Sequence, residues 1–471
     1  MPSQESISKE KRIAILPFNS TIIKDKYLVS NMLGGWDFLS KEEFRLLHSF
    51  NIKNNHTLLE RLYEKGLAVD ENSFKKLIGD YRNLNAHLFR DTSLHIAVVT
   101  TRCNLRCAYC QTKSAQTKDM TQDVARRVLK YIFDMRNHCI TLEFQGGEPL
   151  LNWEILSFLI EYARRFNVIG KQLSLSLVSN LTLLDEDKIQ FLKKFNVGIC
   201  ASLDGPRQIH DRNRVFANGK GTYEVVAKNI EKLKVGLGRK VNLLPTITRQ
   251  SLGHFKEIID EYVKWGEEEI SLRPVNRIGT ACGNWLSLGY STDEFNEFYR
   301  KSMDYILELN KSGVVIRERM AKIMLEKIIN KKDPGYVDLM NPCGTGRATI
   351  AYMPDGSCYP CDEARMVGGE MFKLGNILQE DYQDLVKKDN FLHLLESSLI
   401  NLWDYKSAFF PWTGTCPVVN YILQGNIVPK IKCSSVHRIY ESQFRYIFEK
   451  ILESSENLAI FKNWVNKTEE K

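Results

Sequence analysis

The sequence predicts an α/β fold built on a parallel β-sheet, and three observations lead to this prediction. From residue 93 onward, short β-rich apolar runs alternate with amphipathic runs whose apolar residues recur every three or four positions. The chain has 471 residues, 43% of them hydrophobic and 26% charged, which is enough for two or three packed domains. Successive βαβ crossovers are right-handed, so the sheet is either open and doubly wound or a partial barrel.

The N-terminal 92 residues have a different pattern, which predicts a small α+β unit. Two short extended segments cover residues 13–18 and 26–30. Ser40 and Glu43 have the spacing of a capping box, so a helix is expected to begin there. A second helix is expected over residues 56–65, ending at Gly66.

The central region, residues 93–312, contains the predicted sheet. Its expected strands cover residues 94–100, 140–145, 173–178, 197–203, 241–248 and 270–275. The expected helices cover residues 121–135, 153–166, 186–195, 223–234, 254–265 and 292–311. The last of these helices leads into a third region, residues 313–471.

Three cysteines follow the first predicted strand in the pattern C-x3-C-x2-C. They are Cys103, Cys107 and Cys110. Three thiolates on one loop can hold three irons of a cubane and leave the fourth iron without a protein ligand. A structural zinc site would need a fourth Cys or His nearby, and none follows Cys110 at finger or ribbon spacing. The loop therefore predicts an iron–sulfur cluster with one open iron.

A glycine-rich turn follows the second predicted strand, where parallel sheets bind ligands. It contains Gly146, Gly147, Glu148 and Pro149. Two glycines allow backbone to approach a ligand closely, and the adjacent carboxylate can accept a hydrogen bond from a ligand ammonium. By itself the same string is also compatible with an ordinary strand-to-helix turn.

The cysteine loop, followed by Gly-Gly-Glu-Pro at the next strand end, resembles the radical SAM enzymes. The resemblance implies a partial (β/α)6 barrel carrying a [4Fe–4S] cluster whose open iron is chelated by S-adenosylmethionine. In that family, one electron from the cluster cleaves the sulfonium to a 5′-deoxyadenosyl radical, which takes a hydrogen atom from the substrate.

The same resemblance implies the residues that contact S-adenosylmethionine. The Gly-Gly-Glu-Pro motif contacts the methionine amino group in the family. Ser179 and Asn180, after the third strand, stand where the family contacts the ribose and the carboxylate, although a local turn is an alternative. Tyr109 stands where the family has an aromatic side chain beside the adenine, so stacking is expected.

A stretch beginning at Ser202 resembles one found in radical SAM peptide maturases that carry a SPASM extension. It contains Asp204, His210 and Arg214. We expect either a loop that closes over a substrate or a solvated loop with local salt bridges.

The third region carries a second set of cysteines, Cys343, Cys358, Cys361, Cys416 and Cys433. Their spacing resembles the opening of SPASM or Twitch domains, which bind auxiliary [4Fe–4S] clusters. The dense cysteine run of a full SPASM domain is missing, so we expect one auxiliary cluster held by Cys343, Cys361, Cys416 and Cys433, with Cys358 as a spare or alternative ligand. Four thiolates would suit zinc equally.

Four more residues complete the candidate set. Asp362 follows Cys361, and an acid at this place acts as the base in anaerobic sulfatase-maturing relatives; capping the next turn is the alternative. Cys139, Cys200 and Cys282 have no companions at metal spacing and are expected to be buried small hydrophobes.

Four segments that are less specific than the cysteine motif resemble the B-component radical SAM maturase of the His-Xaa-Ser peptide system. They lie near residues 16–19, 38–44, 361–366 and 416–426. This implies modification of a ribosomally made peptide, a co-encoded second radical SAM maturase, and a reductant such as flavodoxin or ferredoxin. Two alternatives stay open: oxidation of Ser or Cys to formylglycine, as in sulfatase maturation, and a zinc or iron–sulfur protein that regulates or binds nucleic acid.

The resemblance also gives the N-terminal unit a possible role. Paired strands followed by helices are compatible with the winged-helix elements of peptide-modifying enzymes, which add a peptide strand to a sheet edge. An extension that only packs on the barrel explains the pattern equally well.

Charge and hydropathy restrict the partners and the location. Lys and Arg outnumber Asp and Glu by 65 to 57, a formal charge of +8, but without a long basic run, so no nucleic acid is expected. Neither a signal peptide nor a run of ~20 apolar residues is present, so no membrane is expected and the predicted location is cytoplasmic.

Overall fold

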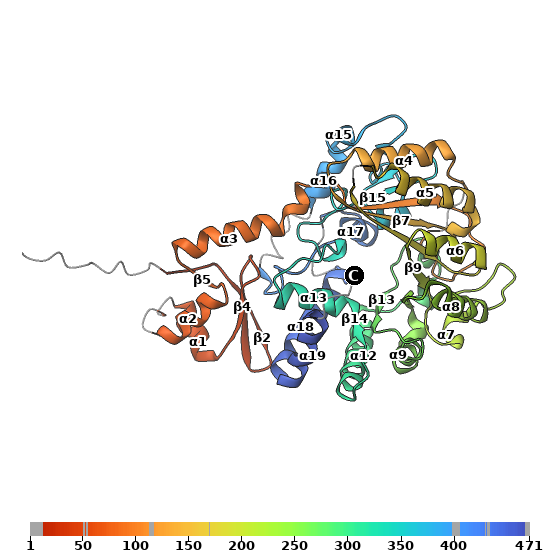
Figure 1. Cartoon of the computed structure of the whole chain (residues 1–471). Helices are drawn as coiled ribbons and strands as arrows, with labels where there is room; N and C mark the ends of the chain where they lie inside the picture. Colours follow the sequence, from red (N-terminus) through yellow and green to blue (C-terminus); the bar gives the residue numbers. More distant parts are fainter. Residues whose placement is uncertain are drawn as a thin grey trace, which may run out of the picture.

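A curved, mainly parallel sheet with helices on its outer face forms the centre of the computed structural model, which describes residues 13–49, 52, 55–112, 117–168, 170–397, 406–428, 430 and 434–466 (Figure 1). The strand order is β10-β9-β8-β7-β6-β15-β16-β17. The predicted α/β fold with a partial barrel is therefore confirmed.

The first four barrel strands pair in parallel and in chain order. They are β6 (Leu94–Thr100), β7 (Cys139–Gly146), β8 (Gln172–Ser179) and β9 (Val197–Ser202). The helices of this region are α4 (Gln122–Asp134), α5 (Trp153–Phe166), α6 (Glu186–Lys194), α7 (Arg207–Asn213), α8 (Tyr223–Leu237), α9 (Phe255–Lys264), α10 (Thr280–Gly283), α11 (Trp285–Leu288) and α12 (Thr292–Lys311). Short α7 was not predicted.

The two remaining predicted strands are each divided. Residues 241–248 form β10 (Asn242–Leu244) and β11 (Thr246–Ile247), because Pro245 lacks the N–H that a continuous ladder needs. Residues 270–275 lie partly in β12 (Glu269–Ile270) and partly in β13 (Arg273–Pro274). β11 pairs with β13, and β12 pairs with β14 (Arg317–Glu318). The closing side of the barrel is thus built from short parallel pairs.

On its other side, the sheet continues into the C-terminal region. β15 (Thr349–Tyr352) pairs in parallel with β6, although about 250 residues separate them in the chain. β16 (Ser357–Tyr359) and β17 (Gly375–Asn376) then add antiparallel strands. The helices of this region are α13 (Arg319–Ile329), α14 (Asp362–Val367), α15 (Tyr382–Leu385), α16 (Asp389–Ser397), α17 (Pro417–Gln424), α18 (Ser435–Glu453) and α19 (Ser455–Asn466).

The N-terminal unit is an antiparallel sheet of β2 (Asn19–Ile23), β3 (Lys26–Ser30) and β4 (Trp36–Leu39), followed by helices. α1 (Lys41–His48) begins at the predicted capping box, with Ser40 and Glu43 each accepting from the other's backbone N–H. The remaining elements are α2 (His56–Glu64), α3 (Glu71–Leu84) and a short antiparallel pair, β1 (Ala14–Ile15) with β5 (Ala68–Val69). β2 and β4 were not predicted.

Aromatic side chains join the N-terminal unit to the C-terminal helices. Trp36 on β4 packs edge-on against Phe448 on α18, with ring centroids 5.0 Å apart, and Trp412 lies 5.4 Å from the same ring. The Trp36 indole also donates to the carbonyl of Ile328, at 3.0 Å. The contacts hold segments far apart in the sequence side by side (Figure 1).

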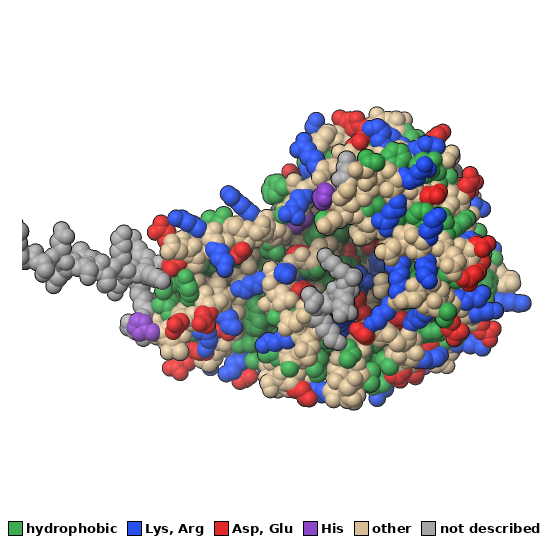
Figure 2. All heavy atoms as spheres, in the orientation of Figure 1, with side chains coloured by type: hydrophobic (Ala, Val, Ile, Leu, Met, Phe, Trp, Pro, Cys, Tyr) green, Lys and Arg blue, Asp and Glu red, His purple; other side chains and the backbone are tan. Residues whose placement is uncertain are grey.

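Acidic and basic side chains are interspersed over the face seen in Figure 2, in keeping with charges spread along the chain. None of the helices in the described ranges is both long and apolar enough to cross a bilayer.

We expect Phe448→Ala to destabilise the protein, because Phe448 is fully buried and its loss leaves a cavity between the N-terminal unit and α18. Such truncations cost about 3–5 kcal/mol. The unfolding temperature should fall, and limited proteolysis should release the N-terminal unit sooner. Phe89→Ala is the matched control, because Phe89 is 84% exposed, and it should behave as wild type. Equal unfolding temperatures for the two variants would contradict the packing role.

Candidate active site

The three loop cysteines follow the carboxyl end of β6 and lie together. Cys103, Cys107 and Cys110 influence one another electrostatically, and the backbone N–H of Leu105 donates to the Cys103 sulfur at 3.4 Å. Burial raises the pKa of Cys103 to about 11 and that of Cys107 to about 12. Among the described residues, no three His, Cys, Asp or Glu side chains are close enough to hold a single metal ion. Three thiols on one loop are the ligand set that a cubane with one open iron requires.

The glycines at the end of β7 make a close backbone contact with the cysteine loop. The N–H of Gly147 donates to the Thr100 carbonyl at 2.9 Å, and the N–H of Glu148 donates to the Arg102 carbonyl at 2.8 Å. A Cβ at Gly146 would lie 2.5 Å from the Thr100 oxygen, and one at Gly147 would lie 2.2 Å from the Arg102 oxygen. The turn therefore needs glycine in order to dock the cysteine loop, a reason that the sequence did not suggest.

Glu148 joins the ends of two strands through its side chain. One carboxylate oxygen accepts from the Ser179 hydroxyl at 2.8 Å and from the Leu150 N–H at 3.0 Å. The other accepts from the Asn180 N–H at 2.8 Å. The residue is fully buried and positions the two strand ends, and its contact with a ligand ammonium stays a prediction.

Ser179, Asn180 and Pro149 lie at the same end of the sheet as the cysteine loop. The Asn180 side chain donates to the side-chain oxygen of Asn104, which lies between Cys103 and Cys107, at 3.1 Å. Pro149 is buried and begins a short 3-10 turn, Pro149–Asn152, where its missing N–H costs nothing. The structure thus groups the residues of the Gly-Gly-Glu-Pro motif with the polar pair after β8.

Tyr109 anchors the cysteine loop to a buried carboxylate. Its hydroxyl lies 2.8 and 2.7 Å from the two oxygens of Asp204, just beyond β9. Asp204 also accepts from the Arg214 guanidinium at 3.2 Å, from Asn213 at 3.1 Å and from the Thr246 N–H at 3.1 Å. The Arg214 guanidinium lies over the Tyr109 ring at 5.3 Å. The phenol therefore has a structural role here, and its contact with adenine stays a prediction.

The stretch around Asp204 is not the solvated loop that the sequence allowed. Asp204 and His210 are fully buried, and burial lowers the pKa of His210 to about 4. A nitrogen of Arg214 lies 4.0 Å from the Cys107 sulfur, so a buried cation stands beside a candidate thiolate. The sequence did not assign this role to Arg214, because only the fold brings the end of β9 beside the cysteine loop.

Three C-terminal cysteines line one small cavity, namely Cys343, Cys361 and Cys416. Cys361 is the N-cap of α14 and accepts from the Ala364 N–H at 3.4 Å, and Cys416 is the N-cap of α17 and accepts from the Val419 N–H at 3.5 Å. Helix N-termini and N–H donors favour thiolates, as a metal cluster requires. The fourth predicted ligand, Cys433, lies outside the described residues.

Cys358 does not join this group. It is fully buried on β16, where its electrostatic neighbours include Tyr131 and Tyr352 of the main core, and it does not line the cavity shared by Cys343, Cys361 and Cys416. The remaining cysteines differ from the expectation of burial, since Cys139 and Cys282 are exposed and Cys200 is half-buried.

Asp362 is connected to the barrel through an arginine. One Asp362 oxygen accepts from the Arg365 Nε at 2.7 Å, and Arg365 also donates to the side-chain oxygen of Gln145 on β7. Gln145 directly precedes the two glycines. Asp362 therefore belongs to a chain of contacts running from the auxiliary cysteines to the end of β7.

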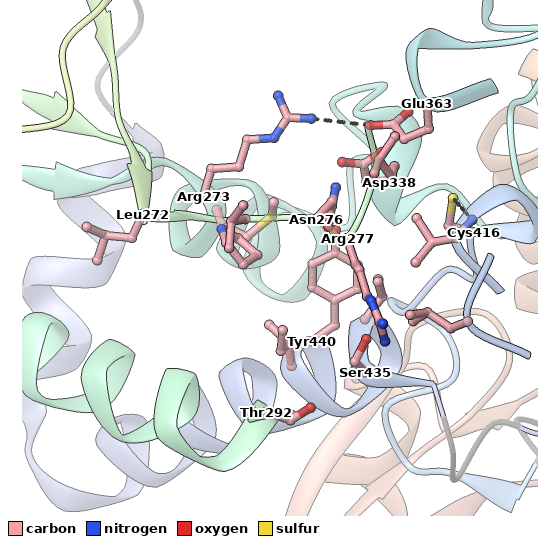
Figure 3. Close-up of a pocket in the computed structure, with 18 of the residues that line it drawn as sticks. Leu272, Arg273, Asn276, Arg277, Thr292, Asp338, Glu363, Cys416, Ser435 and Tyr440 are labelled. Carbon is pink, nitrogen blue, oxygen red and sulfur yellow. Dashed lines mark hydrogen bonds and ion pairs between the residues drawn. The ribbon is translucent and has the colours of Figure 1, made fainter. Parts of the chain in front are cut away.

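A cavity of about 110 Å³ lies beside Cys416 of the C-terminal cysteine site (Figure 3). On one side, the segment after β13 lines it and continues onto the cysteine loop, where the Thr280 N–H donates to the Cys110 carbonyl at 2.8 Å. On the other side, Asp338, Glu363 and Cys416 line it. Burial, together with the neighbouring Asp338, raises the pKa of Glu363 to about 7.

Comparison with known proteins agrees with this geometry. Residues 97–262 match the family model of the radical SAM superfamily, and the chain contains a radical SAM domain in this segment. A cysteine-type anaerobic sulfatase-maturating enzyme of Clostridium perfringens is 29% identical over 318 residues, covering 64% of this chain and 80% of that enzyme. A second such enzyme, from Clostridium novyi, is 24% identical and covers 77% of this chain and 95% of that enzyme.

Solved structures share the fold. The anaerobic sulfatase-maturating enzyme anSMEcpe, solved with bound AdoMet and the Kp18Cys peptide, has a TM-score of 0.67 at 21% identity and covers 79% of this chain and 99% of that one. Streptococcus suis SuiB bound to its precursor peptide SuiA has a TM-score of 0.56 at 14% identity and covers 89% and 98% of the two chains.

We expect Gly147→Ala to displace the cysteine loop, because its methyl group would overlap the Arg102 carbonyl. Iron bound after anaerobic reconstitution should fall by about one cubane. Gly253→Ala is the matched control, since open space surrounds a Cβ there, and it should bind iron as wild type does. Undiminished iron in Gly147→Ala would show that the close contact is not needed.

Proposed function

We propose that this protein is a radical SAM enzyme that modifies a ribosomally made peptide. The observation that carries the proposal is a cavity beside Cys416 whose wall after β13 leads, two residues beyond Ile278, to a backbone contact with Cys110, so that a substrate side chain there would lie near both cysteine sites. The [4Fe–4S] cluster and S-adenosylmethionine, when bound, would supply a radical that abstracts a hydrogen atom. A cytoplasmic location belongs to the same proposal.

The residues around the cysteine loop would bind the cluster and the cosubstrate or hold their binding groups in place. Cys103, Cys107 and Cys110 would hold the cluster, with Arg214 offsetting thiolate charge beside Cys107. Gly146, Gly147, Ser179 and Asn180 would border the cosubstrate, while Glu148 would fix the two strand ends that carry them. Asp204 would hold the loop rigid through Tyr109. Each of these tasks is binding or orientation.

For the auxiliary site we propose one [4Fe–4S] cluster on Cys343, Cys361, Cys416 and Cys433. The shared cavity of the first three supports it. Zinc on the same four thiolates is the alternative. The core position of Cys358 argues against its use as a ligand.

For the substrate class we propose a peptide of the His-Xaa-Ser type, with a co-encoded second radical SAM maturase and a flavodoxin or ferredoxin reductant. The subfamily strings in the sequence support it. The three-stranded N-terminal sheet, in the order β2-β3-β4, supports a peptide-recognition role for residues 1–92.

A second candidate is oxidation of Ser or Cys to formylglycine, favoured by the placement of Asp362. This carboxylate adjoins Cys361 and is linked through Arg365 to the end of β7, so it could accept the proton released as the substrate is oxidised. The mass change on a candidate peptide distinguishes the two functions. Aldehyde formation at Ser or Cys would favour the second, and an intact, modified His-Xaa-Ser peptide would favour the first.

Replacing Cys103, Cys107 and Cys110 together by Ala should abolish release of 5′-deoxyadenosine under dithionite, because the open-iron cluster would have no ligands. The assay is chromatography of the reaction after anaerobic reconstitution. Cys139→Ala is the control, since this exposed cysteine lies outside both sites, and it should retain the wild-type rate. Normal release of 5′-deoxyadenosine by the triple variant would contradict the proposal that these cysteines hold a catalytic cluster.

Cys343→Ala should lower bound iron by about four atoms per chain while leaving the barrel cluster in place. Iron analysis with Mössbauer spectroscopy measures the loss. Cys358→Ala should keep the wild-type iron content, because this side chain lies in the core of the sheet. Unchanged iron content in the Cys343 variant would contradict an iron–sulfur cluster at the C-terminal site, which would then bind zinc or no metal.

A further inference from the structure

The cavity beside Cys416 has an inner wall with more acidic than basic groups. Arg273 and Glu363 form an ion pair there, with 3.2 Å between nitrogen and oxygen. Asp338 stands beside the pair and interacts electrostatically with both (Figure 3). One guanidinium therefore faces two carboxylates, and the side chain of Tyr336 forms a hydrogen bond with Asp338 without adding charge.

The other charged residues of the cavity do not change this balance. Glu318 is fully buried, and its carboxylate accepts from the Tyr299 hydroxyl and from two backbone N–H groups, so it is already satisfied. Arg277 lies at the cavity too, but it is exposed and its guanidinium lies over the Trp285 ring at 5.9 Å. Water screens an exposed charge far more than a buried one. The inner wall thus carries more carboxyl groups than guanidinium groups, and its carboxyl oxygens can accept hydrogen bonds from a ligand.

An unpaired hydrogen-bond acceptor points to the same kind of ligand. Gln443 on α18 is 3% exposed and lines the cavity, and its side-chain oxygen has no hydrogen-bond partner among the described residues. A buried acceptor without a donor destabilises the protein. A ligand that brings an N–H group into the cavity would form this missing hydrogen bond and bind more tightly for it. This observation is independent of the carboxylates.

The size and remaining walls of the cavity define the ligand further. A volume of about 110 Å³ holds a side chain rather than a nucleotide or a peptide segment. Ile422, Leu423 and Ile439 line it with aliphatic surface. Such walls suit the methylene stem of a long side chain whose polar end reaches the carboxylates.

We propose that this cavity binds a basic side chain of the peptide substrate, lysine or arginine, with its stem against Ile422 and Ile439 and its N–H groups toward Asp338 and Gln443. That the side chain belongs to a peptide rests on the proposed function, and its basic character rests on the cavity alone. A basic residue anchored here holds the neighbouring part of the peptide near both cysteine sites.

The test measures binding of capped single amino acids to the full-length, anaerobically reconstituted protein by calorimetry. N-acetyl-argininamide and N-acetyl-lysinamide should bind about tenfold more tightly than N-acetyl-norleucinamide, which has a similar stem and no charge. Asp338→Asn and Gln443→Leu should each reduce this preference to about twofold or less. Asp134→Asn is the matched control: it makes the same chemical change on α4, where the side chain is 63% exposed, and should keep the full preference.

Equal affinity for the charged and neutral compounds would overturn the inference, as would a preference that survives in both cavity variants. If Asp338→Asn fails to fold, Gln443→Leu decides, because it removes the unpaired acceptor and keeps every charge. Binding requires no turnover. A protein that prefers argininamide but releases no 5′-deoxyadenosine would therefore overturn the proposed function and leave the basic-ligand cavity standing.

Discussion

The backbone contact between the cysteine loop and the end of β7 is the constraint on which the rest of the site depends. It exists only because Gly146 and Gly147 lack side chains, so that two N–H groups reach the carbonyls of the loop. Glu148 extends this contact to the end of β8, and Asp204 adds the region after β9 through Tyr109. Three thiols on an otherwise irregular loop are thereby held by the ends of several strands.

The shared sheet places the second cysteine site relative to the first. Because β15 pairs with β6, the C-terminal region is an extension of the barrel rather than a tethered module. Arg365 adds a side-chain link by contacting both Asp362 and Gln145. The cavity beside Cys416 is lined by segments fixed in this way, so its walls have a defined chemistry, which is a condition for selective binding.

Buried acidic groups accumulate in this part of the molecule. Burial raises the pKa of Cys361 and Cys416 well above the usual range and also raises that of Asp338, because each of these groups is costly to charge without water. Helix N-termini at the two cysteines and the guanidinium of Arg273 offset part of this cost. Metal ligation would offset the remaining cost of charging the two cysteines, and a cationic ligand would offset that of charging Asp338.

Local patterns in the sequence determined the elements and the chemistry of the first site. The predicted bounds of β6, α5 and α12 match the structure, and the capping box at Ser40 is present, because periodicity and capping act over neighbouring residues. Only the tertiary structure decided that β15 joins β6, that Cys343, Cys361 and Cys416 meet while Cys358 does not, and that Arg214 lies beside Cys107. The physical reason is that a sequence pattern reports which residues avoid water, whereas contacts between distant segments depend on packing that no local pattern encodes.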